Sequence, residues 1–183
     1  MSFWRKAECL LACAGMVFVR ETVGGFPPTQ LFVVDISVDA EVQIASVSER
    51  FLVLYSSKIE FSEYGRLLCR CDVLVPLTDH KILQELGGDK HACTTLMDVW
   101  SVMRAQARGD PGDLLVDGRP NLFYVPDARG VVRAVRLSWD KERRGWIVAV
   151  FPFNAKDLLT WEGARVFANT FNRRRQLVAS QAA

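Results

Sequence analysis

The stretch that decides the fold of the C-terminal half is NLFYVPDARGVVRAVRLSWDKERRGWIVAV, from Asn121 to Val150. Three apolar runs are separated by PDARG and DKERRG, two segments whose glycines and polar residues are typical of hairpin turns. In the middle run Val135, Leu137 and Trp139 recur at every second position, which is the period of a strand. The stretch therefore predicts a three-stranded antiparallel meander that contributes to a core sheet.

The same alternation divides the remaining side chains of the middle strand between its two faces. Arg133 falls on the face of Val135, whereas Arg136 falls on the other face, among small neighbours. These neighbours are Val132, Ala134 and Ser138. We therefore expect the first face to be structural and Arg136 to be accessible to a ligand.

The segments before the meander predict further strands and two or three helices. Ser2 is a suitable N-cap for a first helix, in which Phe3, Ala7, Leu10 and Ala14 share one side before Gly15. Strand-like segments follow at residues 16–23, 31–38, 42–48 and 50–61, and a buried strand or connecting segment at 65–75.

Two later helices have clearer boundaries. Asp79 can cap a short helix that ends at the pair Gly87-Gly88. Thr94 or Thr95 can cap the next one, around residues 95–107. That helix carries apolar residues at i, i+3, i+4 and i+7, which predicts a buried face. These residues are Leu96, Val99, Trp100 and Met103.

Length and composition set the fold class. A chain of 183 residues, half of them hydrophobic, is long enough for one domain with a proper core. We expect a single α+β domain over residues 1–172, with a largely antiparallel sheet. Residues 173–183, which include Arg173, Arg174 and Arg175, are expected to form a polar basic tail.

The distribution of charge is uneven along the chain. From Met1 to Trp100, nine Lys and Arg stand against thirteen Asp and Glu, a net of −4, and from Ser101 to Ala183 fourteen stand against eight, a net of +6. A basic half can serve acidic partners, including nucleic acid. Because acids are interleaved with most of these arginines, an ordinary solvated surface is the favoured interpretation.

The five cysteines favour a cytoplasmic protein with reduced thiols. They are odd in number, and the chain does not have the composition of a small disulfide scaffold. Glu8 interrupts the apolar N-terminal run, so we expect no signal peptide, and the run is too short to span a bilayer. A membrane is therefore not expected among the partners.

The cysteines and histidines offer two alternative kinds of chemistry. Cys69 with Cys71, and His91 with Cys93, could supply four ligands to a zinc ion, but Cys69 and Cys71 lie in a strongly apolar run that suits buried thiols. Cys93 could act as a nucleophile with His80 or His91 as its base, helped by a helix N-terminus. The sequence contains no glycine-rich phosphate loop. We expect no catalytic residue, no metal and no cofactor.

An aromatic and basic constellation is the candidate ligand-binding site. Arginines beside tryptophans on a sheet can bind phosphates and stack on bases. The alternative is that the tryptophans belong to the core and the arginines pair with Asp127, Asp140 and Glu142. The candidate residues are Arg133, Arg136, Trp139, Trp146, Trp161 and Arg165.

The C-terminal part of the chain resembles a family of short uncharacterised proteins from uncultivated small-genome bacteria. The resemblance covers about the last hundred residues, and it implies a shared fold unit without supplying a chemistry. It is carried by ELGG at Glu85–Gly88, TTL at Thr94–Leu96, LLVDGRPNLFYVPDARGVVRAVRLSW at Leu114–Trp139, GW at Gly145-Trp146, Trp161, and RVF at Arg165–Phe167. Family members often continue RVF with Ser-Arg, where this chain has Ala168-Asn169.

The sequence thus favours a small cytoplasmic, non-catalytic binding or protein-interaction module. Two alternatives from other classes are a nucleic-acid-associated protein that uses the basic C-terminal half, and a metal-binding protein or enzyme built on the Cys and His residues.

Overall fold

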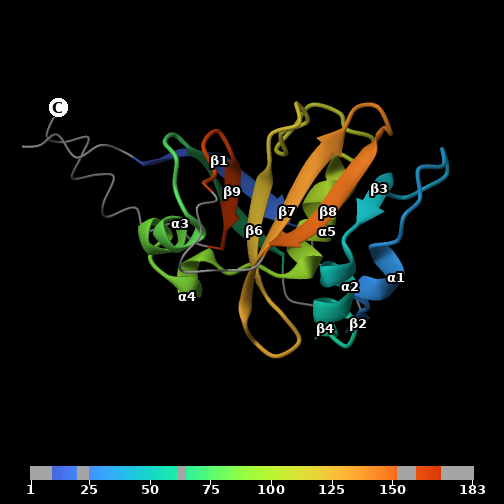
Figure 1. Ribbon diagram of the computed structural model, residues 1–183, viewed down its shortest axis with the longest axis horizontal. Coiled ribbons are helices and arrows are strands. Elements are labelled where there is room, and N and C mark those ends of the chain that lie inside the picture. Colours follow the sequence, from blue (N-terminus) through green and yellow to red (C-terminus); the bar gives the residue numbers. More distant parts are fainter. Residues whose placement is uncertain (1–9, 20–24, 62–64, 152–159, 170–183) are drawn as a thin grey trace, which may run out of the picture.

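A computed structural model describes residues 10–19, 25–61, 65–151 and 160–169 (Figure 1). The start of the expected first helix, Cys9 and the basic tail lie outside these residues. The elements in chain order are β1 (Leu11–Val19), β2 (Gly25–Phe26), α1 (Pro28–Leu31), β3 (Ile44–Val47), α2 (Glu49–Tyr55), β4 (Glu60–Phe61), β5 (Arg66–Val73), α3 (Asp79–Leu86), α4 (Asp89–Ala92), α5 (Leu96–Ala105), β6 (Asn121–Pro126), β7 (Val132–Asp140), β8 (Gly145–Phe151) and β9 (Arg165–Ala168).

The described strands form a seven-stranded sheet in the order β1-β5-β9-β6-β7-β8-β3, and β2 pairs separately with β4. Strands β6, β7 and β8 are the predicted antiparallel meander, with Val135 opposite Phe123 on one side and Val150 on the other. The α+β class is therefore confirmed. The sheet is mixed, because β6 pairs with β9 and β3 with β8 in parallel, and the sequence did not indicate these two pairings.

The sheet is packed on both faces, each with its own hydrophobic cluster. The α5 face is covered by α5, α1 and α2, and it receives Val135, Leu137 and Trp139 of β7. The α3 face is covered by α3, α4 and the segment around Trp161, and it receives Ala134. The predicted alternation along β7 is thus confirmed, and Figure 1 shows α5 behind the strands of the meander.

Helix α5 begins where the sequence predicts, and polar groups hold its N-terminus on two sides. Thr95 and Asp98 form a reciprocal capping box. The buried carboxylate of Glu60 accepts the next two backbone N–H groups, from Leu96 at 3.1 Å and Met97 at 2.9 Å. Lys58 lies 2.8 Å from Glu60 and balances its charge. Burying a carboxylate is acceptable here because N–H donors, the helix dipole and a cation all compensate it.

Helix α3 also ends as predicted, but its N-cap lies one residue before Asp79, the expected cap. The hydroxyl of Thr78 accepts the N–H of Lys81, so Thr78 is the N-cap and Asp79 is the first residue of the helix. Gly87 closes the helix in the left-handed conformation, with φ of 98°, which glycine adopts without steric cost.

Two expected strands are corrected by the structure. Residues 50–55, predicted as part of a strand, belong to α2 because Ser48 caps the N–H of Phe51, and Phe51 and Tyr55 are buried one helical turn apart. Residues 33–38 run as a loop with a single bridge between Asp35 and Ile44, and they leave four aliphatic side chains 50–73% exposed. Those side chains are Val33, Val34, Ile36 and Val38.

The predicted N-terminal helix is wrong for the residues that the structure describes. Leu11–Val19 is the outer strand β1, antiparallel to β5. Val17 and Val19 are buried and Met16 and Phe18 are exposed, so the strand predicted from residue 16 is confirmed as far as Val19, and it begins earlier than predicted, at Leu11. None of the described helices is long and apolar enough to cross a membrane.

The buried stripe of α5 leads to a stability prediction. Trp100 is 5% exposed, and its ring meets Phe32 edge-on at 5.4 Å. Replacing it (Trp100→Ala) should lower the free energy of unfolding by ~3–5 kcal/mol, the range for deleting a large buried aromatic side chain. Chemical denaturation measures this loss, with Ser101→Ala as a control expected to unfold close to the parent. Coincident curves for Trp100→Ala and the parent would show that Trp100 does not contribute to the core.

Candidate functional site

The six predicted ligand-binding residues divide between both faces of the sheet. Trp139 and Trp146 are cross-strand partners on the α5 face, with ring centroids 5.2 Å apart in an edge-on arrangement. The indole N–H of Trp146 donates to the carbonyl of Gln106 at 3.1 Å. Gly109 packs so tightly on Trp139 that a Cβ there would lie 2.2 Å from the ring. Both tryptophans are therefore core residues.

Two of the three predicted arginines are engaged in ion pairs. Arg133 donates through Nε to Asp127 at 2.9 Å. Asp127 also accepts the N–H groups of Arg129 and Val131 and thereby organises the β6–β7 turn. Arg165 donates to both oxygens of Asp72, at 2.7 and 3.3 Å, and to a backbone carbonyl. The positive charge of these side chains is matched by an acid of the same chain.

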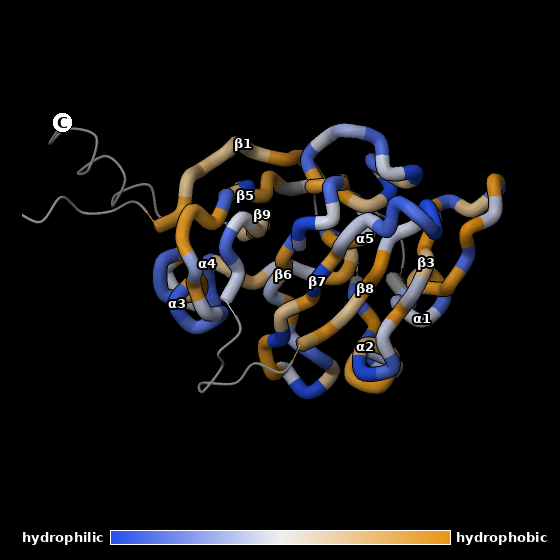
Figure 2. Tube along the Cα trace, turned by 45° about the horizontal axis from the view of Figure 1, so that its top comes forward, coloured by the Kyte–Doolittle hydropathy of each residue, from blue (hydrophilic) through white to orange (hydrophobic). Residues whose placement is uncertain are grey.

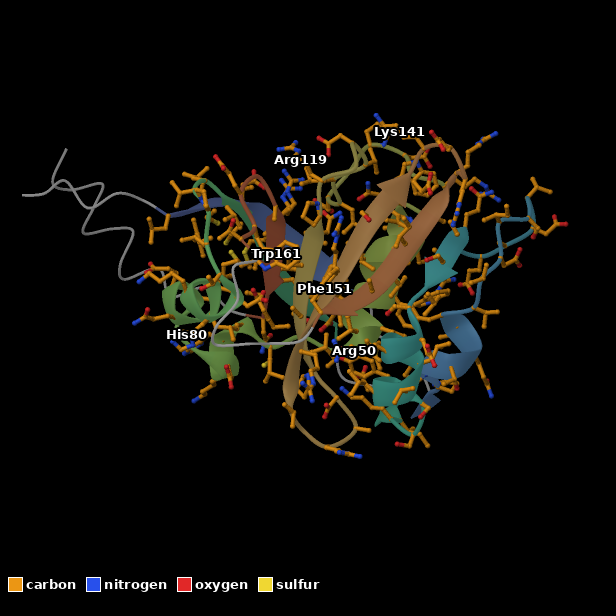
Figure 3. All side chains as sticks on the ribbon, viewed as in Figure 1. Arg50, His80, Arg119, Lys141, Phe151 and Trp161 are labelled. Carbon is orange, nitrogen blue, oxygen red and sulfur yellow. The ribbon has the colours of Figure 1, made fainter. Side chains whose placement is uncertain are left out.

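Arg136 and Trp161 each contact Phe151 on the α3 face. Figure 3 shows Phe151 and Trp161 close together. The guanidinium of Arg136 lies 5.7 Å from the centre of the Phe151 ring, and Trp161 meets that ring edge-on at 5.7 Å. The Nε of Arg136 is buried and finds no hydrogen-bond acceptor in the part of the chain that the structure describes. Burial lowers the pKa of Arg136 from its ordinary value.

Trp161 is held in place by the buried Asp79, which the sequence indicated only as a helix cap. Its indole N–H and the hydroxyl of Tyr124 both donate to Oδ1 of Asp79, at 2.9 and 2.8 Å. Burial raises the pKa of Tyr124 well above its ordinary value, so the hydroxyl stays protonated and remains a donor. Asp79 therefore ties the start of α3 to β6 and to the segment before β9.

An open groove of about 680 Å³ lies on the α3 face between α3 and the β6–β7 turn. His80 and Gln84 of α3 line one wall, and Gly130, Val131 and Val132 line the other. The polar residues that line the groove come from separate elements. Arg136 does not line it. The groove is accessible, but it does not bring together an acid, a base and a nucleophile.

The Cys and His residues weighed as metal ligands are separated. Cys69 and Cys71 lie in the cluster of the α3 face, while Cys93 follows α4 and is bridged to Tyr124. In the described ranges, no group of three or more His, Cys, Asp or Glu side chains could hold a metal ion. Burial, with a contribution from Asp89, raises the pKa of Cys93 to about 11. A helix N-terminus could have lowered this pKa, but burial raises it instead, which disfavours the thiolate form.

A different set of cysteines does come together between β1 and β5. The Sγ of Cys13 lies 3.5 Å from that of Cys69, which lies 3.6 Å from that of Cys71. Cys13 is exposed, whereas Cys69 and Cys71 are buried, and no disulfide joins them. The sequence signal was the two-residue spacing of Cys69 and Cys71, but it could not identify β1 as their neighbour.

The outer strand β1 carries an apolar surface that is open to solvent. Phe18 is 63% exposed, Met16 is 46% exposed, and Leu67, which pairs with Phe18 across the two strands, is 51% exposed. Figure 2 shows the apolar colouring of β1 along the outer side of the sheet. In the described part of the chain, no strand pairs with the outer edge of β1.

The contacts of Asp79 generate a prediction. Asp79→Ala removes the acceptor of two buried donors, which should cost about 2–5 kcal/mol of unfolding free energy, since each unsatisfied buried group costs about 1–3 kcal/mol. Asp79→Asn keeps an oxygen in the same place and should cost clearly less. Chemical denaturation of both variants compares them. Equal losses for the two variants would show that acceptance by Oδ1 does not account for the stabilisation.

No family model, no curated protein and no solved structure matches this chain. The resemblance of the C-terminal residues to a bacterial family thus stays a prediction. Function must be inferred from three features of the chain itself: the outer edge of β1, Arg136 on the α3 face, and the cysteines between β1 and β5.

Proposed function

We propose that the protein is a small cytoplasmic, non-catalytic interaction module, and that the outer edge of β1 is its interaction surface. The observation that carries this proposal is an outer strand without a single charged residue, flanked by the exposed side chains of Met16, Phe18 and Leu67. Natural sheets ordinarily protect such edges with charged side chains, proline, bulges, short strands or a covering element. Strand β1 has a bulge between Cys13 and Gly15, but within the described residues it has no charge, no proline and no strand on its outer side, so it is suited to pairing with another strand.

The occupant that fits this edge is a second copy of the chain. Two β1 strands related by a twofold axis perpendicular to them run antiparallel. Every contact between two residues then occurs twice, once on each side of the axis. Because Leu11–Val19 contains no charged side chain, this self-pairing opposes no like charges. The exposed row of Met16, Phe18 and Leu67 would continue across the axis and become buried. Strand pairing and apolar burial thus favour the same dimer.

The cytoplasmic assignment is part of the proposal and rests on the cysteines. The four described cysteines form no disulfide, and the chain contains an odd number. Support for binding without catalysis comes from the ion pairs of Arg133 and Arg165 and from the raised pKa of Cys93. Charged groups engaged in this way stabilise the fold and are poor candidates for general acid or base chemistry.

Self-association can be tested by sedimentation equilibrium over a wide range of protein concentration. The parent protein should show a reversible monomer–dimer equilibrium. Phe18→Lys replaces an exposed apolar side chain of the proposed interface with a charge and should weaken dimerisation by at least about tenfold, the effect of ~1.4 kcal/mol. Phe18 is mostly exposed, so the variant should keep the thermal stability of the parent.

The matched control is Val38→Lys, which makes the same kind of change at a residue that is 73% exposed and precedes β3, at the opposite edge of the sheet. This variant should dimerise like the parent. A parent protein that stays monomeric at the highest concentration would overturn the second copy as the occupant. Dimers that persist in Phe18→Lys but dissociate in Val38→Lys would place the interface elsewhere.

The nucleic-acid alternative depends on Arg136. Within the described residues its guanidinium has an aromatic contact but no ion pair, in contrast to Arg133 and Arg165. A phosphate placed beside Phe151 could accept from this guanidinium. The nucleic-acid alternative therefore predicts a small number of phosphate contacts, and Arg136 is the first residue to test.

Titration of a mixed RNA and DNA pool at several salt concentrations tests this alternative. If Arg136 contacts a phosphate, Arg136→Ala should reduce the slope of log affinity against log salt by about one unit. Arg143→Ala, at a largely exposed arginine in the β7–β8 turn, is the control and should bind with the slope of the parent. Absence of binding at low salt would eliminate this alternative, and equal slopes for Arg136→Ala and the parent would show that Arg136 takes no part.

A further inference from the structure

The three clustered thiols lie on two strands that are hydrogen-bonded to each other. Cys13 of β1 is the backbone partner of Cys71 in β5, and a bulge between Cys13 and Gly15 shifts the register of β1 along β5. Cα atoms directly opposite in an antiparallel pair are about 4.5–5.5 Å apart, within the range that disulfides span. The bulge also brings the Sγ of Cys13 within 3.5 Å of Cys69.

The environments of the three sulfur atoms differ. Cys13 is exposed, while Cys69 and Cys71 are 1% and 0% exposed. The hydrogen bond with Cys69, together with burial, raises the pKa of Cys71 far above the ordinary range, which keeps this thiol protonated. A disulfide reagent in solution therefore reaches Cys13 first. The thiols of β5 lie behind Cys13, where one of them can form the second bond.

From this arrangement we propose that Cys13 and the β5 thiols form an oxidation-sensitive dithiol site, in which Cys13 becomes bonded to Cys69 or Cys71. The oxidant is a low-molecular-weight disulfide such as oxidised glutathione. The site does not depend on dimerisation, because all three sulfur atoms belong to one chain. Oxidation would covalently join the exposed outer strand β1 to the strand behind it.

The reaction is a pair of thiol–disulfide exchanges. The Cys13 thiolate attacks one sulfur of oxidised glutathione, a mixed disulfide forms, and one glutathione thiolate leaves. A β5 thiol then gives up its proton as its sulfur attacks the Cys13 sulfur, and the second glutathione leaves. Two protein thiols are oxidised and one small disulfide is reduced to two thiols, which take up the two protons that the cysteines release. Because thiolates attack, the rate should rise with pH.

Cys93 provides an internal comparison. Cys93 is half-buried, and its pKa is raised to about 11. Its backbone is bridged to Tyr124 of β6, whereas the three clustered thiols lie on β1 and β5. If disulfide formation only reflected general thiol oxidation, Cys93 would be modified together with Cys13. If disulfide formation depends on the contacts between β1 and β5, Cys93 should keep its free thiol.

The experiment equilibrates the reduced protein with graded mixtures of reduced and oxidised glutathione, traps the remaining thiols by alkylation, and maps the linked peptides by mass spectrometry. Trypsin cleaves after Arg70, so it separates Cys69 from Cys71 and identifies the partner. Cys9 and Cys13 share a tryptic peptide, so the mapping is repeated with Cys9→Ser.

The parent and Cys9→Ser should form an intramolecular link between Cys13 and one β5 cysteine. Cys93→Ser should form the same link over the same range of glutathione ratios, and Cys13→Ser should form none. The proposal is overturned if the parent stays fully alkylated under the most oxidising mixture, or if Cys13 stops at the mixed disulfide with glutathione. A link to Cys9 or Cys93, or between two chains, would overturn it as well.

Discussion

Burial of the β6–β7–β8 meander on both faces is the constraint on which the rest of the structure depends. Within β7, Leu137 and Ala134 point in opposite directions, and both are fully buried. Helices must therefore cover each side of the sheet, and most of its central surface is unavailable to a partner. What remains accessible is its periphery: the outer strand β1, the groove beside α3, and the place on the α3 face where Arg136 meets Phe151.

Buried carboxylates hold the covering helices against the sheet. Glu60 accepts the first N–H groups of α5, and Asp79 accepts donors from β6 and from the segment that contains Trp161. Each acid is compensated by directed donors, without which its burial would be strongly unfavourable. Two further acids, Asp127 and Asp72, pair with Arg133 and Arg165 and so balance the charge of two of the three arginines proposed as ligand-binding residues.

The two proposals concern the same strand but are physically independent. Self-pairing of β1 uses its outer backbone edge and the apolar side chains beside it, whereas the dithiol site uses contacts between β1 and β5 within one chain. An outer strand is held by hydrogen bonds on one side, so it is the strand whose attachment a disulfide can alter most. The exposed residues of the 33–38 loop form a second apolar region, with no strand edge to define a partner.

The sequence by itself determined the meander, the faces of β7, and the buried stripe and cap of α5, because these depend on local period and local hydrogen bonds. Only the tertiary structure decided that residues 49–55 are helical, that β1 replaces a helix, and that β9 and β3 pair in parallel. Short apolar segments suit either a strand or a helix, and the surface they bury against makes the choice. The predicted ligand-binding residues are divided between the two faces of the sheet for a related reason. Residue type marks an arginine as able to bind an anion, but whether an acid distant in sequence neutralises it, as Asp72 does for Arg165, depends on how the strands are ordered.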